Sequence, residues 1–258
     1  MSDIPHPVQS LIGKVQRLVS IDKEDVAALR ALPHRTADAK AHTYIVREGT
    51  KPQECCLLIE GYAARSKLSA DGGRQIVSFH VAGDMLDLQH LFLEKADHCV
   101  QAITDVKLVW VPMNALRELV TRRPAIGTAF WRDALVDASI FREWVLNVGR
   151  RDAKTRIAHM LCEFIVRSEV AGLGTAHDIR LPFTQEQIGD ATGLTSVHVN
   201  RMMRELTEEG LIERSPGALR VRDWARFKRA AEFDPAYLHT SPTRLEPSGL
   251  DRAVQSAS

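Results

Sequence analysis

Residues 182–221 read PFTQEQIGDATGLTSVHVNRMMRELTEEGLIERSPGALRV, and this stretch determines the predicted fold of the C-terminal half. Thr184 followed three residues later by Gln187 is a capping box, so a helix is predicted to begin directly after Thr184. Gly193 can adopt the left-handed backbone that ends this helix. Thr195 is a second N-cap only two residues further on. Two helices joined by so short a turn must cross steeply, which predicts a helix-turn-helix.

The second helix is predicted to run to about Glu209, end at Gly210 and have two different faces. Its inner face is expected to consist of Val199, Met202, Met203 and Leu206. Its outer face carries Ser196, Val197, Asn200, Arg201 and Arg204. The outer residues begin at the helix N-terminus, where a recognition helix presents side chains to base edges. Residues 211–221, with a turn at 215–217, predict a β-hairpin wing, which favours DNA binding over an ordinary helical hairpin with a solvated polar face.

Ten residues of this stretch are candidates for contact with DNA. They are Thr184, Thr195, Ser196, Val197, His198, Asn200, Arg201, Arg204, Arg214 and Arg220. Arg201 lies about one and a half turns into the helix, where a long side chain can reach the floor of the major groove and contact a base. Thr195, Arg214 and Arg220 are predicted to position the protein on phosphates. The alternative for Arg201 is a surface ion pair with Glu205, four residues later.

The N-terminal half changes from helical to strand-like periodicity. Residues 8–32 have apolar positions at three- and four-residue spacing, and Pro33 ends the second of two predicted helices. From about 41 to 112 short strands alternate with turns. The predicted strands are Cys55–Glu60, Ala63–Leu68, Gln75–His80, Val100–Ile103 and Val106–Val111. Strands at this spacing predict a small antiparallel barrel or roll.

Residues 113–148 return to helical periodicity, with Asn114 as a candidate N-cap and Pro124 suited to the first turn of a longer helix. Large apolar residues recur near one side of that helix and predict a dimer interface. They are Ile126, Phe130, Ile140, Trp144 and Val148. The alternative is that this side packs on the helix's own barrel. Residues 149–152 are a predicted hinge, and a further helix is expected over 153–168.

The composition is that of a soluble globular protein. The chain has 258 residues, a formal net charge of +1, 45% hydrophobic and 26% charged residues. No signal peptide is visible, and no apolar run approaches the ~20 residues that span a membrane, so a cytoplasmic protein without a membrane partner is expected. The four cysteines form no C-x-x-C pair and are expected to be free thiols: Cys55, Cys56, Cys99 and Cys162.

Residues 193–201 (GLTSVHVNR), with EL at 205–206 and GLI at 210–212, resemble the signature helix-turn-helix of the Crp/Fnr superfamily of bacterial regulators. The order of parts matches over about residues 10–230. The resemblance implies an α+β fold: an antiparallel β-roll of the double-stranded β-helix type, a long dimerisation helix and a C-terminal winged helix-turn-helix. The implied division is N-terminal helices 1–40, cyclic-nucleotide-binding-like β-roll 41–113, dimerisation helix 114–150 and DNA-binding domain 151–230. Residues 231–258 are predicted to be a disordered tail, because the chain is polar and contains several prolines from Pro235 onward.

The resemblance also implies roles for residues in the recognition helix. The Arg at the position of Arg201 usually contacts a guanine in the family, and its fork of donors matches guanine O6 and N7. Family members often carry Glu where this chain has Val197, and some carry Arg where it has Ser196. Asn200 adds a candidate adenine contact. These departures leave room for a target sequence unlike the best-known half-sites.

The predicted effector region departs further from the family. Members that bind cyclic nucleotides use a Glu and an Arg after the phosphate-loop glycine, but residues 83–99 contain no Arg. Their carboxylates would repel a phosphate, so cyclic AMP is not the expected effector. The candidate pocket residues are Gly83, Asp84, Asp87 and His98. The effector itself stays unspecified.

No cofactor is predicted. Cysteine is absent before Cys55, whereas oxygen-sensing members hold an iron–sulfur cluster near the N-terminus. An alternative is a metal site formed by Asp84, Asp87, His90 and His98, but this spacing is not specific. His80 is a conceivable haem ligand, yet no haem motif accompanies it.

The sequence therefore predicts a homodimeric transcription regulator, not an enzyme, that binds a near-palindromic site in double-stranded DNA. RNA polymerase and a small-molecule effector are further expected partners. Two alternatives stay open. One is a small-molecule, metal or haem sensor whose output is a protein contact; the other is a metal- or haem-dependent enzyme built on the roll.

Overall fold

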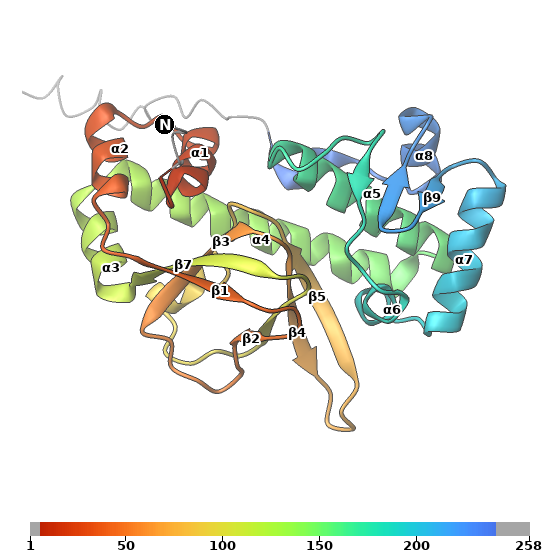
Figure 1. Ribbon diagram of the computed structural model, residues 1–258, viewed down its shortest axis with the longest axis horizontal. Coiled ribbons are helices and arrows are strands. Elements are labelled where there is room, and N and C mark those ends of the chain that lie inside the picture. The colour runs from red at the N-terminus through yellow and green to blue at the C-terminus, as the bar shows by residue number, and fades with distance from the viewer. Residues whose placement is uncertain (1–5, 241–258) are drawn as a thin grey trace, which may run out of the picture.

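The computed structural model describes residues 6–240 and places a β-roll beside a mainly helical domain (Figure 1). The long helix α4 (Pro124–Arg150) runs behind both parts. In the described part of the chain, no helix is both long and apolar enough to cross a bilayer.

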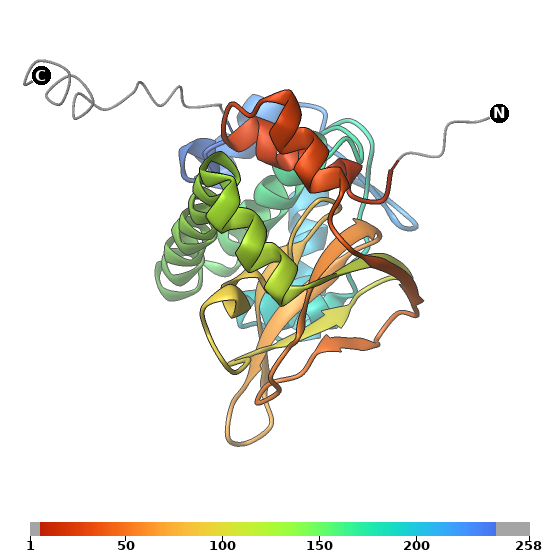
Figure 2. The same ribbon diagram turned by 90° about the vertical axis from the view of Figure 1, so that its left-hand side faces the viewer.

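Two short helices cover one end of the roll, as Figure 2 shows. Helix α1 spans Gln9–Leu18 and α2 spans Lys23–Arg30. Asp22 accepts a hydrogen bond from the backbone N–H of Asp25, and the Asp25 side chain accepts one in return, so a capping box begins α2. The helical prediction for 8–32 is confirmed.

The roll consists of two antiparallel sheets. Their strands are β1 (Arg35–Ala39), β2 (Tyr44–Val46), β3 (Glu54–Glu60), β4 (Ala63–Leu68), β5 (Arg74–His80), β6 (Cys99–Ala102) and β7 (Val106–Pro112). One sheet has the order β1-β7-β3 and the other β2-β6-β4-β5. A short 3-10 helix, η1 (Leu88–Leu91), lies between β5 and β6. Cys55 and Cys56 are buried in different core clusters, as expected for adjacent residues of one strand.

The predicted boundary of the roll at residue 41 is wrong. Residues 35–39 form β1, which pairs with β7 in the register Arg35↔Trp110. Its sequence, RTADA, has no large apolar residue, so the alternation that marks a half-buried strand is missing. Helix α3 (Met113–Arg122) leads into α4 and begins after Pro112 rather than at Asn114.

The C-terminal domain contains α5 (Ala153–Val170), α6 (Gln185–Thr192), α7 (Ser196–Glu208) and α8 (Trp224–Ala230). A small sheet of order β8-β10-β9 is formed by Ile179–Arg180, Glu213–Ser215 and Ala218–Arg220. Thr184 and Gln187 form the predicted capping box, and Gly193 ends α6 with a φ of 69°. The winged helix-turn-helix is therefore confirmed.

The prediction of a disordered tail from residue 231 is wrong for 231–240. A 3-10 helix, η2 (Pro235–Leu238), packs against α4 and buries Leu238. The Tyr237 hydroxyl donates to Glu163 Oε2 at 2.8 Å. These contacts fasten η2 to α4 and α5. Residues 241–258 of the predicted tail lie outside the described residues.

The helical domain is docked directly on the roll. Phe79 of β5 stacks on Phe183, just before α6, with ring centroids 4.0 Å apart. Arg74 Nε and Asp190 Oδ2 are 2.6 Å apart across the same boundary. One apolar cluster continues from β4 and β5 through α4 into the core of the helical domain. The roll and the helix-turn-helix domain are therefore joined by direct side-chain contacts as well as by the chain.

Candidate DNA-binding surface and effector pocket

The turn between α6 and α7 depends on a close approach of backbones. A Cβ on Gly189 would lie 2.4 Å from the carbonyl oxygen of Leu194, so only glycine fits there. Thr195 Oγ1 accepts the backbone N–H of His198 at 3.3 Å and begins α7. The sequence analysis did not identify Gly189 as necessary for this turn, because a glycine inside a helix does not indicate which backbone it contacts.

Helix α7 divides into the two faces that its periodicity predicts. The buried residues are Val199, Met202, Met203 and Leu206. The exposed residues include Ser196, Val197, Asn200, Arg201 and Arg204. His198, between the faces, is only half-buried. The first two turns of α7 therefore present a continuous surface to solvent.

Arg201 is exposed at the outer face of α7 and makes no ion pair within residues 6–240. The alternative contact with Glu205 is therefore not formed. Arg204 differs, since its Nε lies 3.5 Å from Glu208 Oε1 in the next turn. Arg201 is thus the arginine of this helix that is not already paired with an acid.

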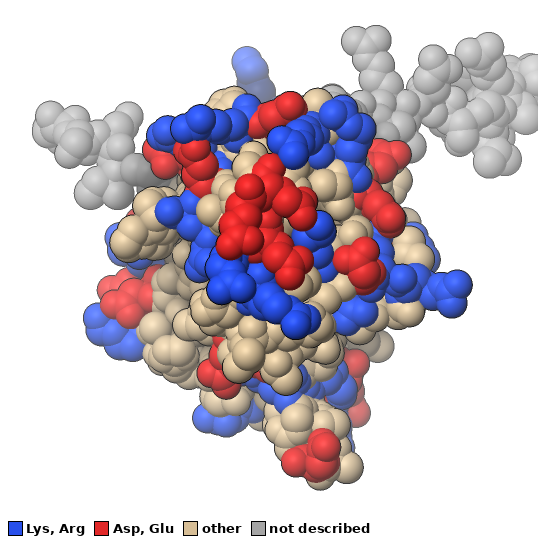
Figure 3. All heavy atoms as spheres, turned by 90° about the vertical axis from the view of Figure 1, so that its right-hand side faces the viewer, with Lys and Arg blue, Asp and Glu red and all other residues tan. Residues whose placement is uncertain are grey.

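The surface around α7 is mixed in charge. Figure 3 shows an acidic patch bordered by Lys and Arg side chains on the face that carries this helix. Two acids follow one another in this part of the chain: Glu209 pairs with Lys154 at 2.6 Å, and Glu208 lies near Arg204. Both glutamates belong to the C-terminal end of α7. The anionic DNA backbone is therefore expected to meet the N-terminal half.

The two predicted wing arginines differ in their surroundings. Arg214, in β9, is exposed. Arg220 Nε donates to the backbone carbonyl of His177 at 2.9 Å and so ties β10 to the loop that precedes β8. Thr184 is exposed, but its hydroxyl is used to cap α6. Of these three, Arg214 has the side chain best placed for a phosphate.

A cavity of about 460 Å³ lies where α1, the roll, α4 and α5 meet. Gly83, Asp84 and His98 line it, as predicted. Asp87 does not line it: its carboxylate is buried in the roll and accepts the backbone N–H of Cys56 at 2.9 Å. Burial raises the pKa of Asp87. Asp87 therefore has a structural role, and its place in the predicted pocket is wrong.

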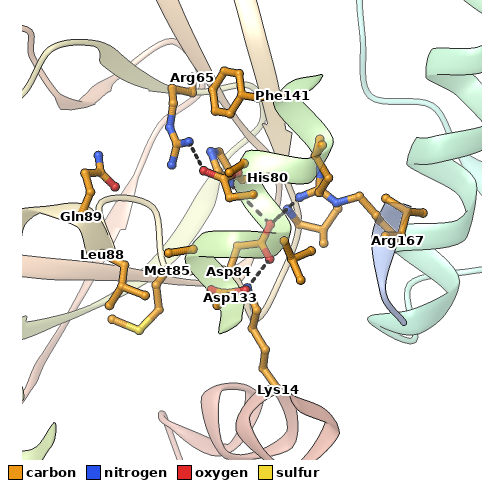
Figure 4. Close-up of a pocket in the computed structure, with 18 of the residues that line it drawn as sticks. Lys14, Arg65, His80, Asp84, Met85, Leu88, Gln89, Asp133, Phe141 and Arg167 are labelled. Atoms are coloured by element: carbon orange, nitrogen blue, oxygen red, sulfur yellow. Dashed lines mark hydrogen bonds and ion pairs between the residues drawn. The ribbon is translucent and has the colours of Figure 1, made fainter. Parts of the chain in front are cut away.

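Lys and Arg side chains from distant elements also line this cavity: Lys14, Arg17, Arg65, Lys67 and Arg167. Figure 4 labels three of them, Lys14, Arg65 and Arg167. Lys14 Nζ lies 3.1 Å from Asp84 Oδ1, and Arg167 Nη2 lies 2.9 Å from Asp84 Oδ2. Arg65 Nη1 lies 2.7 Å from Asp137 Oδ2. Residues 83–99 contain no Arg, but other elements supply cations to the cavity, each of these three beside a carboxylate.

Asp84 is the centre of this charge cluster. Burial alone would raise the pKa of its carboxyl, but the cations of Lys14 and Arg167 hold the pKa well below its usual range. His80 Nδ1 lies 3.5 Å from the same carboxylate. Asp84 thus remains ionised and connects α1, β5 and α5.

Two buried polar atoms beside this cavity have no hydrogen-bond partner among the described residues. They are Arg65 Nε and His80 Nε2. Both side chains line the cavity and are almost completely buried. Buried polar groups are normally hydrogen-bonded, so a ligand or water in the cavity is expected to use them.

Because two histidines are buried, we expect the free energy of unfolding to fall at mildly acidic pH. Burial lowers the pKa of His80 and of His159 to about 4. Between that value and the unfolded value near 6.5, the unfolded chain binds more protons, so stability falls as pH falls. Each ring is expected to reduce the free energy of unfolding by about 2 kcal/mol between pH 7 and pH 5.

Urea unfolding at pH 7, 6 and 5 measures this effect, and His159→Gln is expected to remove about half of the difference. A wild-type free energy of unfolding that does not change over this range would contradict the prediction.

The side of α4 that the sequence predicts as the dimer interface is largely buried within the same chain, so this prediction is wrong for most of its residues. Four predicted interface residues, Ile126, Phe130, Ile140 and Trp144, are buried against their own chain. Trp144 Nε1, for example, donates to Glu163 Oε2 at 3.0 Å. Val148 is half-buried. The large exposed apolar residues of α4 are instead Trp131, Leu135, Val145 and Leu146.

In the described part of the chain, no three His, Cys, Asp or Glu side chains are grouped so that they could hold a metal ion. The fold and the outward face of α7 define a winged-helix DNA-binding regulator with an N-terminal β-roll. Residues 37–123 match the model of the cyclic nucleotide-binding domain family, and residues 155–230 match that of the Crp-like helix-turn-helix domain.

Known proteins support this class. The transcriptional activatory protein AadR of Rhodopseudomonas palustris is 33% identical over 177 residues, covering 67% of this chain and 72% of that protein. The transcriptional activator protein FnrL of Cereibacter sphaeroides is 25% identical over 217 residues, covering 83% and 86%. The structure of FixK2 from Bradyrhizobium japonicum matches with a TM-score of 0.71 and 24% identity, covering 77% of this chain and 98% of that one.

The chain belongs to the Crp/Fnr family, and it is a DNA-binding transcription regulator of that type. This family consists of transcription regulators, so neither the enzyme alternative nor the protein-contact alternative is favoured.

Proposed function

We propose that this regulator binds a near-palindromic DNA site as a homodimer, with one α7 in the major groove of each half-site. The observation that carries the proposal is the exposed N-terminal face of α7, on which Arg201 is not paired with an acid. A two-fold symmetric protein requires a two-fold symmetric site. Since its target is DNA, the protein is expected to act in the cytoplasm.

Genome-wide DNA capture with purified protein, followed by motif discovery, tests this proposal. The expected motif is an inverted repeat whose half-sites are about one helical turn apart. Capture of sites without two-fold symmetry, or of none, would contradict the proposal. Because relatives such as FnrL are named transcriptional activators, contact with RNA polymerase is proposed as well. Run-off transcription from a captured promoter measures it.

The homodimer is proposed to form through the exposed apolar side of α4. Leu135 is 64% exposed and Val145 is 73% exposed, and pairing with a second copy would remove both from water. A carboxylate introduced at either position enters the interface from both copies, which is strongly unfavourable because the charges have no partners.

The double variant Leu135→Asp, Val145→Asp is therefore expected to sediment as a monomer at micromolar concentration. The wild type is expected at about twice its chain mass of 28.8 kDa. Leu68→Asp, at an exposed leucine of the roll, is the matched control and should leave the dimer intact. A double variant that remains dimeric would show that α4 pairs through another side or not at all.

The cavity is proposed to bind a small-molecule effector. Because Arg167 belongs to α5, an occupant would contact the DNA-binding domain as well as the roll. Cyclic AMP is still not expected, since Lys14, Arg65 and Arg167 are already paired with carboxylates that its phosphate would have to displace. Calorimetry tests this directly, and micromolar affinity for the nucleotide would contradict it.

A further inference from the structure

The recognition helix carries a large apolar side chain that points into solvent. Val197 is 82% exposed, more than any other large apolar residue in the described range, whereas Val199 in the same helix is completely buried. A β-branched residue is also less favourable in a helix than alanine. Neither packing nor helix stability therefore accounts for a valine here.

The neighbours of Val197 indicate what it contacts. Asn200 and Arg201 follow it by three and four residues, so the three side chains share one face of α7, and all three are exposed. Asparagine and arginine match adenine and guanine edges in the major groove. The apolar group that the major groove offers is the 5-methyl of thymine. A valine against cytosine or guanine would instead leave their polar groups without partners.

We propose that Val197 is a specificity-determining residue that packs against the 5-methyl group of a thymine in each half-site. This thymine lies within about two base pairs of the guanine that Arg201 is proposed to contact, because one turn of the α-helix advances ~5.4 Å and one base pair of DNA ~3.4 Å. The inference rests on the proposed docking of α7 in the major groove.

Deoxyuridine substitution tests the contact, because it removes the thymine methyl and leaves every hydrogen-bonding group in place. Each thymine of a captured operator is replaced in turn, and affinity is measured for the wild type and for Val197→Ala. One thymine per half-site is expected at which deoxyuridine weakens wild-type binding at least threefold. Val197→Ala should lose affinity for the thymine operator by a similar factor and be insensitive to deoxyuridine there.

Leu68→Ala is the matched control, because it removes another exposed apolar side chain far along the chain, in the roll. It should keep the wild-type sensitivity to deoxyuridine. The inference is overturned if no thymine shows the methyl effect, or if Val197→Ala retains it. A wild type that captures no operator would contradict the proposed function, so the two failures are distinguishable.

Discussion

Replacing Asp84 by asparagine is expected to lower the free energy of unfolding by about 3 kcal/mol. The side chain is 14% exposed and pairs with Lys14 and Arg167, whose side chains are 18% and 14% exposed. Removing one partner of a buried ion pair costs about 3–5 kcal/mol because it leaves charge without compensation. The lower end applies here, since Asp133 still pairs with Lys14 at 2.9 Å and Glu163 lies 3.5 Å from Arg167.

Urea unfolding at pH 7 measures this change. Glu60→Gln is the matched control, because Glu60 pairs with Lys107 at 3.0 Å while both side chains are more than half exposed. An exposed pair contributes about 1 kcal/mol or less. Equal losses in the two variants would refute the buried role assigned to Asp84.

The pH dependence of the same variant is a second check. The pKa of Asp84 lies below its unfolded value near 3.9. Its stabilising contribution is therefore present above pH ~4 and is lost as pH falls through the folded pKa. The difference between wild type and Asp84→Asn should stay constant between pH 7 and 5 and shrink below pH 4.

The helix-turn-helix could be predicted from sequence because its determinants are local. Thr184 and Gln187 cap each other across three residues, and Gly193 ends α6 with a backbone that other residues rarely adopt. The inner face of α7 follows from helical periodicity alone. None of these inferences requires knowledge of a distant contact.

The effector cavity could be predicted only in part, because its cations come from elements far apart in the chain. Asp84 and His98 belong to one predicted loop region, but Lys14 lies on α1, Arg65 on β4 and Arg167 on α5. No local pattern brings these side chains together. Residues 83–99 alone therefore do not reveal the cations that line the cavity.

Helix α4 shows a second limit of prediction from sequence. Both of its sides carry large apolar residues, Ile140 and Trp144 on one, Leu135 and Val145 on the other. Periodicity finds an apolar side but does not say whether it packs on the same chain or on a second copy. The packing of Trp144 against Glu163 of α5 decides this, and it is a tertiary contact.

Arg201→Ala is expected to weaken binding to a captured operator by about 1–3 kcal/mol per half-site and to relax the preference at one base pair. Arg201 is exposed, lies on the same face as Asn200 and is not held by an acid in the described structure, so its donors are available to guanine O6 and N7. Since no ion pair is lost, the free energy of unfolding should change by no more than about 0.5 kcal/mol.

Arg214→Ala is the matched control for a phosphate contact. It should weaken binding to all sequences alike and reduce the slope of log affinity against log salt by about one. Arg220 is a poorer control than the sequence suggested, because its bond to His177 also holds the wing in place. A binding array that covers every single-base variant of the operator separates the two effects. If Arg201→Ala lowers affinity equally for all of them, Arg201 contacts phosphate, and Asn200 becomes the residue that distinguishes bases.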